Sequence, residues 1–188
     1  ATVDGGAGAL AGLGFRLLDA GGREVEPVGG RLAEVASIEW PPGPRPLDGV
    51  EVDVLCDVDN PLLGERGAAS VYGPQKGATP DAVERLEAGL ARLAERYDRD
   101  LGRQVAGEPG AGAAGGLGAG LSAALGARLV PGFETLATLL GLSDRRARAD
   151  LVLSGEGRLD RTSVMGKVLC GLGRLAAEKG RPLVALVG

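Results

Sequence analysis

Two acidic side chains and an amide come directly after a segment in which apolar and polar residues alternate. Asp57, Asp59 and Asn60 follow residues 50–56, whose period of two is typical of a half-buried strand. In α/β sheets, ligand-binding groups gather where strands end. Carboxylate oxygens placed there can hold Mg²⁺ or accept a proton from a hydroxyl. The alternative is an Asx turn with solvated acids, and the spacing alone does not choose between the two.

A lysine stands in a glycine-bounded turn just before the clearest predicted helix. Gln75 and Lys76 precede a helix that we expect over residues 80–101, with Thr79 as its N-cap. The N–H groups at a helix N-terminus attract anions, and an ammonium group suits a phosphate oxygen. Only three of the 21 basic residues are lysines. A lysine in this turn therefore invites a functional explanation, although chance placement is equally compatible with the sequence.

The segment 110–115 matches the GxGxxG pattern of dinucleotide-binding loops. Such a fingerprint must follow a strand, but the segment is preceded by Gly102-Arg103-Gln104 and, directly before it, by Gly107-Glu108-Pro109. The hypothesis that the chain is a nicotinamide- or flavin-binding oxidoreductase rests on this match alone. Two other interpretations stay open. The backbone of Gly110, Gly112, Gly115 and Gly116 can cradle a phosphate or carboxylate, or the glycines can allow a close contact that admits no side chain.

Acids and cations gather again after an apolar segment at residues 150–154. Glu156, Arg158 and Asp160 lie in the following loop, and Lys167 comes seven residues after Asp160. Phosphoryl transfer needs an acid near the attacking hydroxyl or metal, and cations near the phosphoryl oxygens. This stretch supplies both kinds of group. A solvated charged loop is the alternative.

Short apolar segments that alternate with helical patterns indicate an α/β protein. The last strand, helix and strand are expected to form a parallel unit with a right-handed crossover. We expect strands over residues 15–19, 24–26, 50–56, 150–154 and 183–187 and near Leu129, and helices over residues 31–36, 80–101, 133–140 and 164–179.

The composition narrows the function further. The net charge of −4 argues against nucleic acid as a partner. The chain has no histidine, which excludes Ser-His and Cys-His nucleophilic machinery within it. Neither a long apolar run nor a signal-peptide pattern occurs, so we expect a cytoplasmic protein without a membrane partner. The two cysteines are expected to be buried, reduced thiols. The oligomeric state is left open.

Five segments of the chain resemble, in the same order, the signature segments of the bacterial glycerate kinases. They are DVDNPL at 57–62, GPQKGATP at 73–80, PGAGAAGGLG at 109–118, GEGRLD at 155–160 and GK at 166–167. The opening DGGAG at 4–8 resembles the end of that family's (S/A)TNDGGAG segment. Val3 stands where the family usually has Asn, and Thr162-Ser163 where Gln-Thr is usual. The likeness extends over the whole chain.

The resemblance implies a two-domain α/β fold with the active site between the domains. Residues 1–149 are expected in the second α/β domain and residues 150–188 in part of a Rossmann-like parallel-sheet domain. The chain opens without Met and stops on an apolar segment. We therefore expect a fragment, with further amino- and carboxy-terminal segments completing the Rossmann-like domain.

The resemblance also implies phosphoryl transfer from ATP to D-glycerate with Mg²⁺, giving 2-phosphoglycerate in most of the family. A non-catalytic interaction domain is the other alternative. If the segments form one site, Asp57, Asp59, Lys76 and Asp160 should border a common cleft. The expected catalytic residues are Asp160, Lys167 and Glu156, and the expected Mg²⁺ ligands are Asp57 and Asp59. The expected substrate and phosphate ligands are Asp57, Asp59, Asn60, Gln75, Lys76, Gly110, Gly112, Gly115, Gly116 and Arg158.

Overall fold

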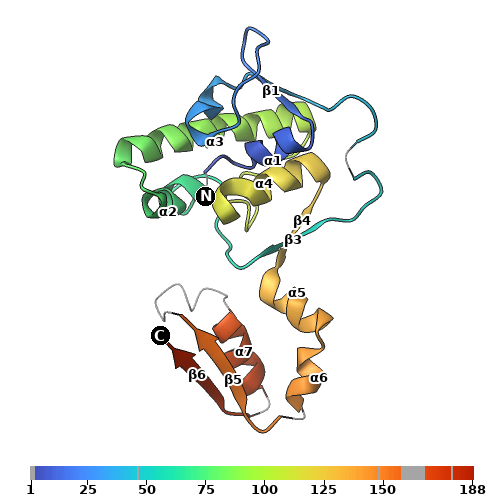
Figure 1. The fold of residues 1–188 in the computed structure, drawn as a ribbon, viewed down its shortest axis with the longest axis vertical. Helices are drawn as coiled ribbons and strands as arrows, with labels where there is room; N and C mark the ends of the chain where they lie inside the picture. Colours follow the sequence, from blue (N-terminus) through green and yellow to red (C-terminus); the bar gives the residue numbers. More distant parts are fainter. Residues whose placement is uncertain (1–2, 46, 148, 158–167, 179) are drawn as a thin grey trace. The chain divides into compact units, whose positions relative to one another are not determined.

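The computed structural model describes residues 3–45, 47–147, 149–157, 168–178 and 180–188. By their internal contacts they form two units, Ala1–Leu129 and Val130–Gly188. Both units combine helices with short strands (Figure 1), which confirms the predicted α/β class. The first unit ends at Leu129, whereas the domain boundary predicted from the sequence follows residue 149. The assignment of these two stretches to domains stays a prediction.

The helix predicted over residues 80–101 is present as α3 (Pro80–Leu101). Thr79 is its N-cap, and the threonine hydroxyl accepts a hydrogen bond from the N–H of Ala82. At the other end Gly102 takes a left-handed conformation with φ of 72°, which glycine adopts without steric cost. Both ends are therefore determined by local sequence signals.

The core of the first unit lies against one face of α3. Leu90, Leu93 and Tyr97 are fully buried there, and burial of each leucine contributes about 2 kcal/mol. The Tyr97 hydroxyl donates a 2.9 Å hydrogen bond to the carbonyl oxygen of Gly5, which ties α3 to the start of the chain. The same unit contains α1 (Ala7–Gly12), the 3-10 helix η1 (Gly29–Glu34) where an α-helix is predicted over 31–36, α2 (Ala68–Tyr72), the 3-10 helix η2 (Pro74–Lys76) and α4 (Ala113–Leu125).

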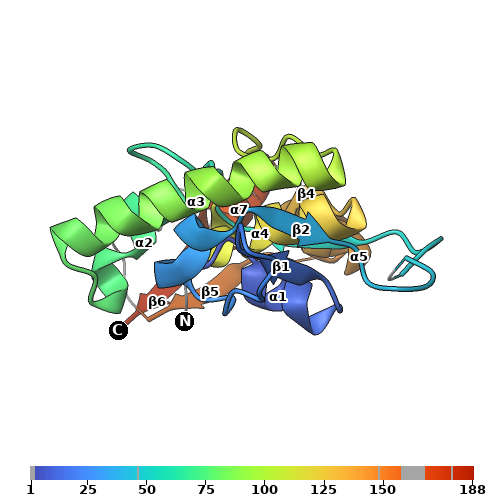
Figure 2. The same cartoon turned by 90° about the horizontal axis from the view of Figure 1, so that it is seen from above.

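The predicted strand at residues 15–19 pairs mainly with a segment that lies beyond the strand predicted at 24–26. β1 (Arg16–Leu18) pairs in antiparallel fashion with β2 (Ser37–Glu39), and Figure 2 shows α3 running alongside β2. The strand predicted at 24–26 is present only as a bridge from Leu18 to Glu24. Pairing with β2 places the buried Ile38 opposite Leu17, and such apolar cross-strand pairs stabilise a sheet.

A second small sheet brings the first candidate acids to the end of a strand. β3 (Asp53–Cys56) pairs with β4 (Arg128–Pro131), and it is shorter than the predicted 50–56. The Arg128 guanidinium bonds the Asp53 carboxylate at 2.7 Å, and this hydrogen bond lowers the pKa of Asp53. The chain leaves β3 at Cys56 and continues into Asp57, as the sequence predicts.

The second unit contains the parallel pair that the sequence predicts. β5 (Val152–Glu156) runs parallel to β6 (Leu183–Val187), from Val152 opposite Leu183 to Glu156 opposite Val187, which confirms the parallel arrangement. The handedness of the crossover stays a prediction. Also in this unit are α5 (Gly132–Leu139), α6 (Leu142–Ala147) and α7 (Val168–Ala177), of which α7 packs against both strands (Figure 1).

Within the described residues, none of the helices combines the length and the apolar character that crossing a membrane requires.

Candidate functional site

The loop after β3 carries two of the predicted acids, and their surroundings differ. The side chains of Asp57 and Asp59 are both on exposed residues. Asp59 Oδ1 accepts a hydrogen bond of 2.9 Å from Arg66 Nη2. Both partners are more than 60% exposed, so this ion pair adds little to stability, but it orients the Asp59 carboxylate. In the part of the chain that the structure describes, the Asp57 carboxylate accepts no hydrogen bond.

Asn60 is buried, with 6% of its surface exposed, and both ends of its side-chain amide are hydrogen-bonded within the chain. Asn60 Nδ2 donates to the Arg66 carbonyl oxygen at 2.8 Å. Asn60 Oδ1 accepts a 3.0 Å hydrogen bond from the Tyr72 hydroxyl. Burial, followed by the charge of Asp59, raises the pKa of Tyr72, so the phenol stays protonated as a donor. Asn60 thereby joins the acidic loop to the last residue of α2.

The glycine-rich segment lies directly against the acidic loop. The N–H of Gly112 donates to the Asn60 carbonyl oxygen at 2.9 Å. A Cβ on Gly112 would overlap the carbonyl oxygen of Pro61, and one on Gly110 would come within 3.2 Å of the Cys56 side chain. Glycine is required here because two backbones meet closely.

The next two candidate glycines make the same kind of contact elsewhere. Gly116 has φ of 95°, and a Cβ on it would lie 2.6 Å from the Cα of Gly5. The N–H groups of Gly115 and Gly116 both donate to the Gly112 carbonyl oxygen. These contacts favour the close-packing interpretation of the segment over a backbone cradle with unused N–H groups. Binding of a ligand by these glycines stays a prediction.

The turn with the predicted phosphate ligands follows α2 immediately. Gln75 and Lys76 are exposed and lie in η2, and Gln75 Nε2 donates to the Val71 carbonyl oxygen at 3.2 Å. Tyr72, at the end of α2, contacts Asn60. The helix before the turn and the glycine-rich segment therefore both contact Asn60, whereas the position of Gln75 and Lys76 beside Asp57 stays a prediction.

The remaining candidates belong to the second unit. Glu156 is the last residue of β5, is partly exposed, and its carbonyl oxygen accepts a 3.3 Å hydrogen bond from the N–H of Gly188. Arg158, Asp160 and Lys167 lie outside the described residues. The expectation that Asp57, Asp59, Lys76 and Asp160 border a common cleft therefore stays a prediction.

The acidic loop, residues 57–60, offers the two carboxylates of Asp57 and Asp59 to a metal ion. No three His, Cys, Asp or Glu side chains come together as a metal site among the described residues. Mg²⁺ commonly takes one or two carboxylates together with phosphate oxygens and water. Asp57 and Asp59 thus fit a cation that is shared with a phosphorylated ligand, although Asp59 is already paired with Arg66.

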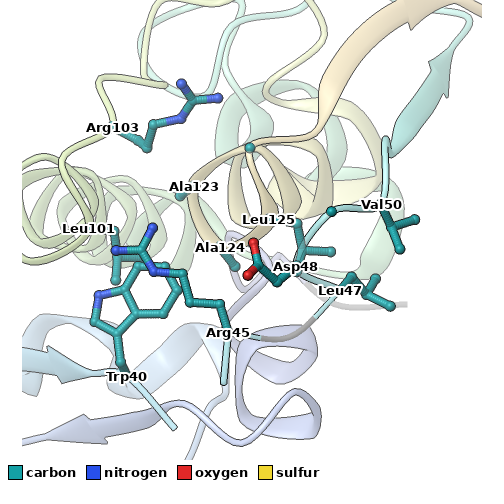
Figure 3. A pocket seen from close by; sticks show the side chains of 12 residues that line it. Trp40, Arg45, Leu47, Asp48, Val50, Leu101, Arg103, Ala123, Ala124 and Leu125 are labelled. Atoms are coloured by element: carbon teal, nitrogen blue, oxygen red, sulfur yellow. The ribbon is translucent and has the colours of Figure 1, made fainter. Parts of the chain in front are cut away.

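A pocket that no sequence motif indicates lies at the C-terminal ends of α3 and α4 (Figure 3). It has a volume of about 410 Å³. The Arg45 guanidinium lies over the Trp40 ring, 4.5 Å from its centre, and Asp48 and Arg103 also line the pocket. The pocket is lined by none of the predicted site residues. The single tryptophan beside a proline-rich loop is the sequence signal that could have indicated it.

Comparison with known proteins gives a consistent set of relatives. The family model described as "Glycerate kinase family" matches residues 1–188. The glycerate kinase of Halalkalibacterium halodurans is 45% identical over 188 residues, which are 100% of this chain and 50% of that protein. The glycerate 2-kinase of Escherichia coli (strain K12) is 41% identical over 100% of this chain and 49% of its own length.

A solved structure supports the same relationship. It is a crystal structure provisionally named glycerate kinase 2, from Salmonella typhimurium LT2, with a TM-score of 0.81 and 44% identity. The similarity covers 100% of this chain and 50% of that one, and it confirms the predicted fold class. The chain thus spans about half the length of the relatives that it matches.

Proposed function

The chain belongs to the glycerate kinase family, and from this we propose that the protein transfers the γ-phosphoryl group of ATP to the 2-hydroxyl of D-glycerate. The observation that carries the proposal is the family match over residues 1–188, together with relatives named glycerate kinase at 41–45% identity. The E. coli relative is named a glycerate 2-kinase, which favours 2-phosphoglycerate as the product. A cytoplasmic location stays a prediction from the sequence.

The competing interpretation as a nicotinamide-binding oxidoreductase loses its support. It rests on the GxGxxG match at residues 110–115, and the structure accounts for those glycines in another way. Gly112 packs against the Pro61 carbonyl oxygen and donates its N–H to Asn60. Its N–H is therefore not available to a pyrophosphate in this arrangement.

Phosphoryl transfer is catalysed mainly by positioning and by stabilising charge. In the first unit, Asp57 offers an exposed carboxylate to the glycerate hydroxyl or to Mg²⁺. Gln75 and Lys76 offer a donor and a cation to a phosphate or carboxylate oxygen. Bound ATP would supply the phosphoryl group, and Mg²⁺ would neutralise part of its charge.

The second group of residues would act on the developing charge of the phosphoryl group. We assign Lys167 and Arg158 to the phosphoryl oxygens, and Asp160 and Glu156 to the attacking hydroxyl or the metal. Their order after β5 supports this assignment, because ligand-binding groups in α/β sheets follow the carboxyl ends of strands.

The proposal is tested by following the reaction with ³¹P NMR in the longest form of the protein that contains residues 1–188. We expect a 2-phosphoglycerate signal that requires ATP, Mg²⁺ and D-glycerate together. Reactions with L-glycerate, or without Mg²⁺, are the controls. A 3-phosphoglycerate signal alone would contradict the assigned position, and the absence of any phosphoglycerate would contradict the activity.

A further inference from the structure

The two acids after β3 differ in what their carboxylates contact. Asp59 Oδ1 is hydrogen-bonded to the Arg66 guanidinium at 2.9 Å. The Asp57 carboxylate is on an exposed residue and accepts no hydrogen bond in the part of the chain that is described. Two acids that are equivalent by sequence spacing are therefore different in the folded chain.

Arg66, the partner of Asp59, is held through its backbone by a hydrogen bond from the buried Asn60. The Arg66 carbonyl oxygen accepts a 2.8 Å hydrogen bond from Asn60 Nδ2, and the other end of that amide is bonded to Tyr72. Because Asn60 is buried, leaving its amide unpaired would be costly. The guanidinium that meets Asp59 thus starts from a fixed backbone position.

Further hydrogen bonds fix the middle of the loop between Asn60 and Arg66. The N–H of Gly64 donates to Glu87 Oε1 of α3 at 2.6 Å, and the Ser70 hydroxyl donates to the Gly64 carbonyl oxygen at 3.2 Å. The loop from Asn60 to Arg66 is therefore tied to both α2 and α3. A loop held at several points can keep a neighbouring carboxylate in one place, which catalysis requires.

The two acids also differ in the charged groups beside them. The positive Arg66 offsets the charge of Asp59 and would repel a second cation brought to the same carboxylate. Among the described residues, no ion pair joins a basic side chain to the Asp57 carboxylate. An incoming Mg²⁺ or hydroxyl therefore finds its better oxygen ligand at Asp57.

Building on the proposed function, we propose that the acids divide their roles. Asp57 is the residue that contacts the glycerate hydroxyl or the cation bound with it. Asp59 is a positioning residue, which acts through Arg66 to hold the loop that carries Asp57. Asp59 is then no longer one of the expected Mg²⁺ ligands, and Arg66, a residue that no motif indicates, helps to position the loop.

The test compares Asp57→Asn, Asp59→Asn, Arg66→Gln and the double variant Asp59→Asn/Arg66→Gln in the longest form of the protein. Steady-state rates are measured at varied D-glycerate and varied Mg²⁺. We expect Asp57→Asn to lower kcat by about 100-fold or more, the scale of losing a positioned acid-base group. We also expect it to raise the Mg²⁺ concentration needed for half-maximal rate.

The other variants should behave as one unit. Asp59→Asn and Arg66→Gln should each lower kcat/KM by a similar factor, below about tenfold, and the double variant should be no worse than either. Their Mg²⁺ requirement should match that of the unsubstituted protein. Glu34→Gln, which breaks the exposed Arg31–Glu34 ion pair far from the loop in sequence, is the control and should leave the rates unchanged. Melting temperatures should fall by no more than about 4 °C in the pair variants.

The outcomes separate this proposal from the proposed function. If the unsubstituted protein forms no phosphoglycerate, the proposed function itself fails. If it is active and Asp59→Asn is as inactive as Asp57→Asn, or shifts the Mg²⁺ requirement, the division of roles is overturned. An additional loss from Asp59→Asn in the Arg66→Gln background would overturn it as well.

Discussion

Replacing Gly116 by alanine is expected to lower the free energy of unfolding of the first unit by about 3 kcal/mol or more. A left-handed conformation costs a residue with a Cβ about 1–2 kcal/mol, and the φ of Gly116 is 95°. The added Cβ would also lie 2.6 Å from the Cα of Gly5 and 2.8 Å from the side chain of Leu62. Relieving such an overlap costs a further 1–3 kcal/mol or so. The loss is large beside the ~5–15 kcal/mol that stabilises a typical domain.

Substitutions at two other glycines separate the cost of the left-handed conformation from the cost of the steric overlap. Gly102 has φ of 72° with no atom near its missing Cβ, so Gly102→Ala should cost only about 1–2 kcal/mol. Gly107 has neither a positive φ nor a close neighbour, and Gly107→Ala should change little. Urea unfolding followed by Trp40 fluorescence reports on the first unit, because Trp40 is the single tryptophan and packs on Phe15. Equal losses for Gly116→Ala and Gly102→Ala would show that the close backbone approach is wrong.

The largest effect on activity is expected from Lys167→Ala, which should lower kcat by about two to three powers of ten. This is the scale of losing one preorganised electrostatic donor to the transition state. An interaction made only in the transition state lowers kcat and kcat/KM together. We therefore expect KM for D-glycerate to stay within about threefold in steady-state assays of the longest form of the protein.

Lys179→Ala is the matched control, since Lys179 stands near the end of a predicted helix with no motif around it. Its kinetics should be those of the unsubstituted protein. If Lys167→Ala is as active as Lys179→Ala, the assignment of Lys167 to the phosphoryl oxygens is wrong. The membership of the chain in the glycerate kinase family would stand, because it does not depend on that lysine.

Local signals in the sequence account for the elements that were predicted best. Thr79 and Gly102 mark the two ends of α3 correctly, because an N-cap hydroxyl and a left-handed glycine act within one turn of the helix. The parallel pairing of β5 with β6 follows from two apolar segments separated by a helical pattern.

Other elements depend on partners that the local sequence does not reveal. α4 lies in a glycine- and alanine-rich stretch for which no helix is predicted, and Ala114, Gly115 and Gly116 near its start have left-handed conformations. Its packing depends on close contact with the first residues of the chain, such as that between Gly120 and Gly6. β2 has only three residues, too few for alternation to be seen.

The place of one candidate residue in the fold could be predicted from the sequence, whereas the contacts of its neighbours could not. The position of Asp57 at the end of a strand followed from the alternating pattern before it. The pairing of Asp59 with Arg66 could not be predicted, because it depends on how the intervening loop closes. The same holds for the Tyr72 hydroxyl on Asn60, since nothing in the spacing of these two residues indicates a contact.

We propose that D-glycerate and Mg²⁺-ATP bind the first unit at the loop after β3. The most direct test of this proposal is to follow backbone amide signals by ¹⁵N–¹H NMR while D-glycerate and Mg²⁺-ATP are added. We expect saturable shift changes centred on Asp57, Asn60 and Gly112. Changes confined to the pocket beside Trp40, seen at its indole N–H, or no change at the Asp57–Asn60 loop at saturating ligand, would contradict it.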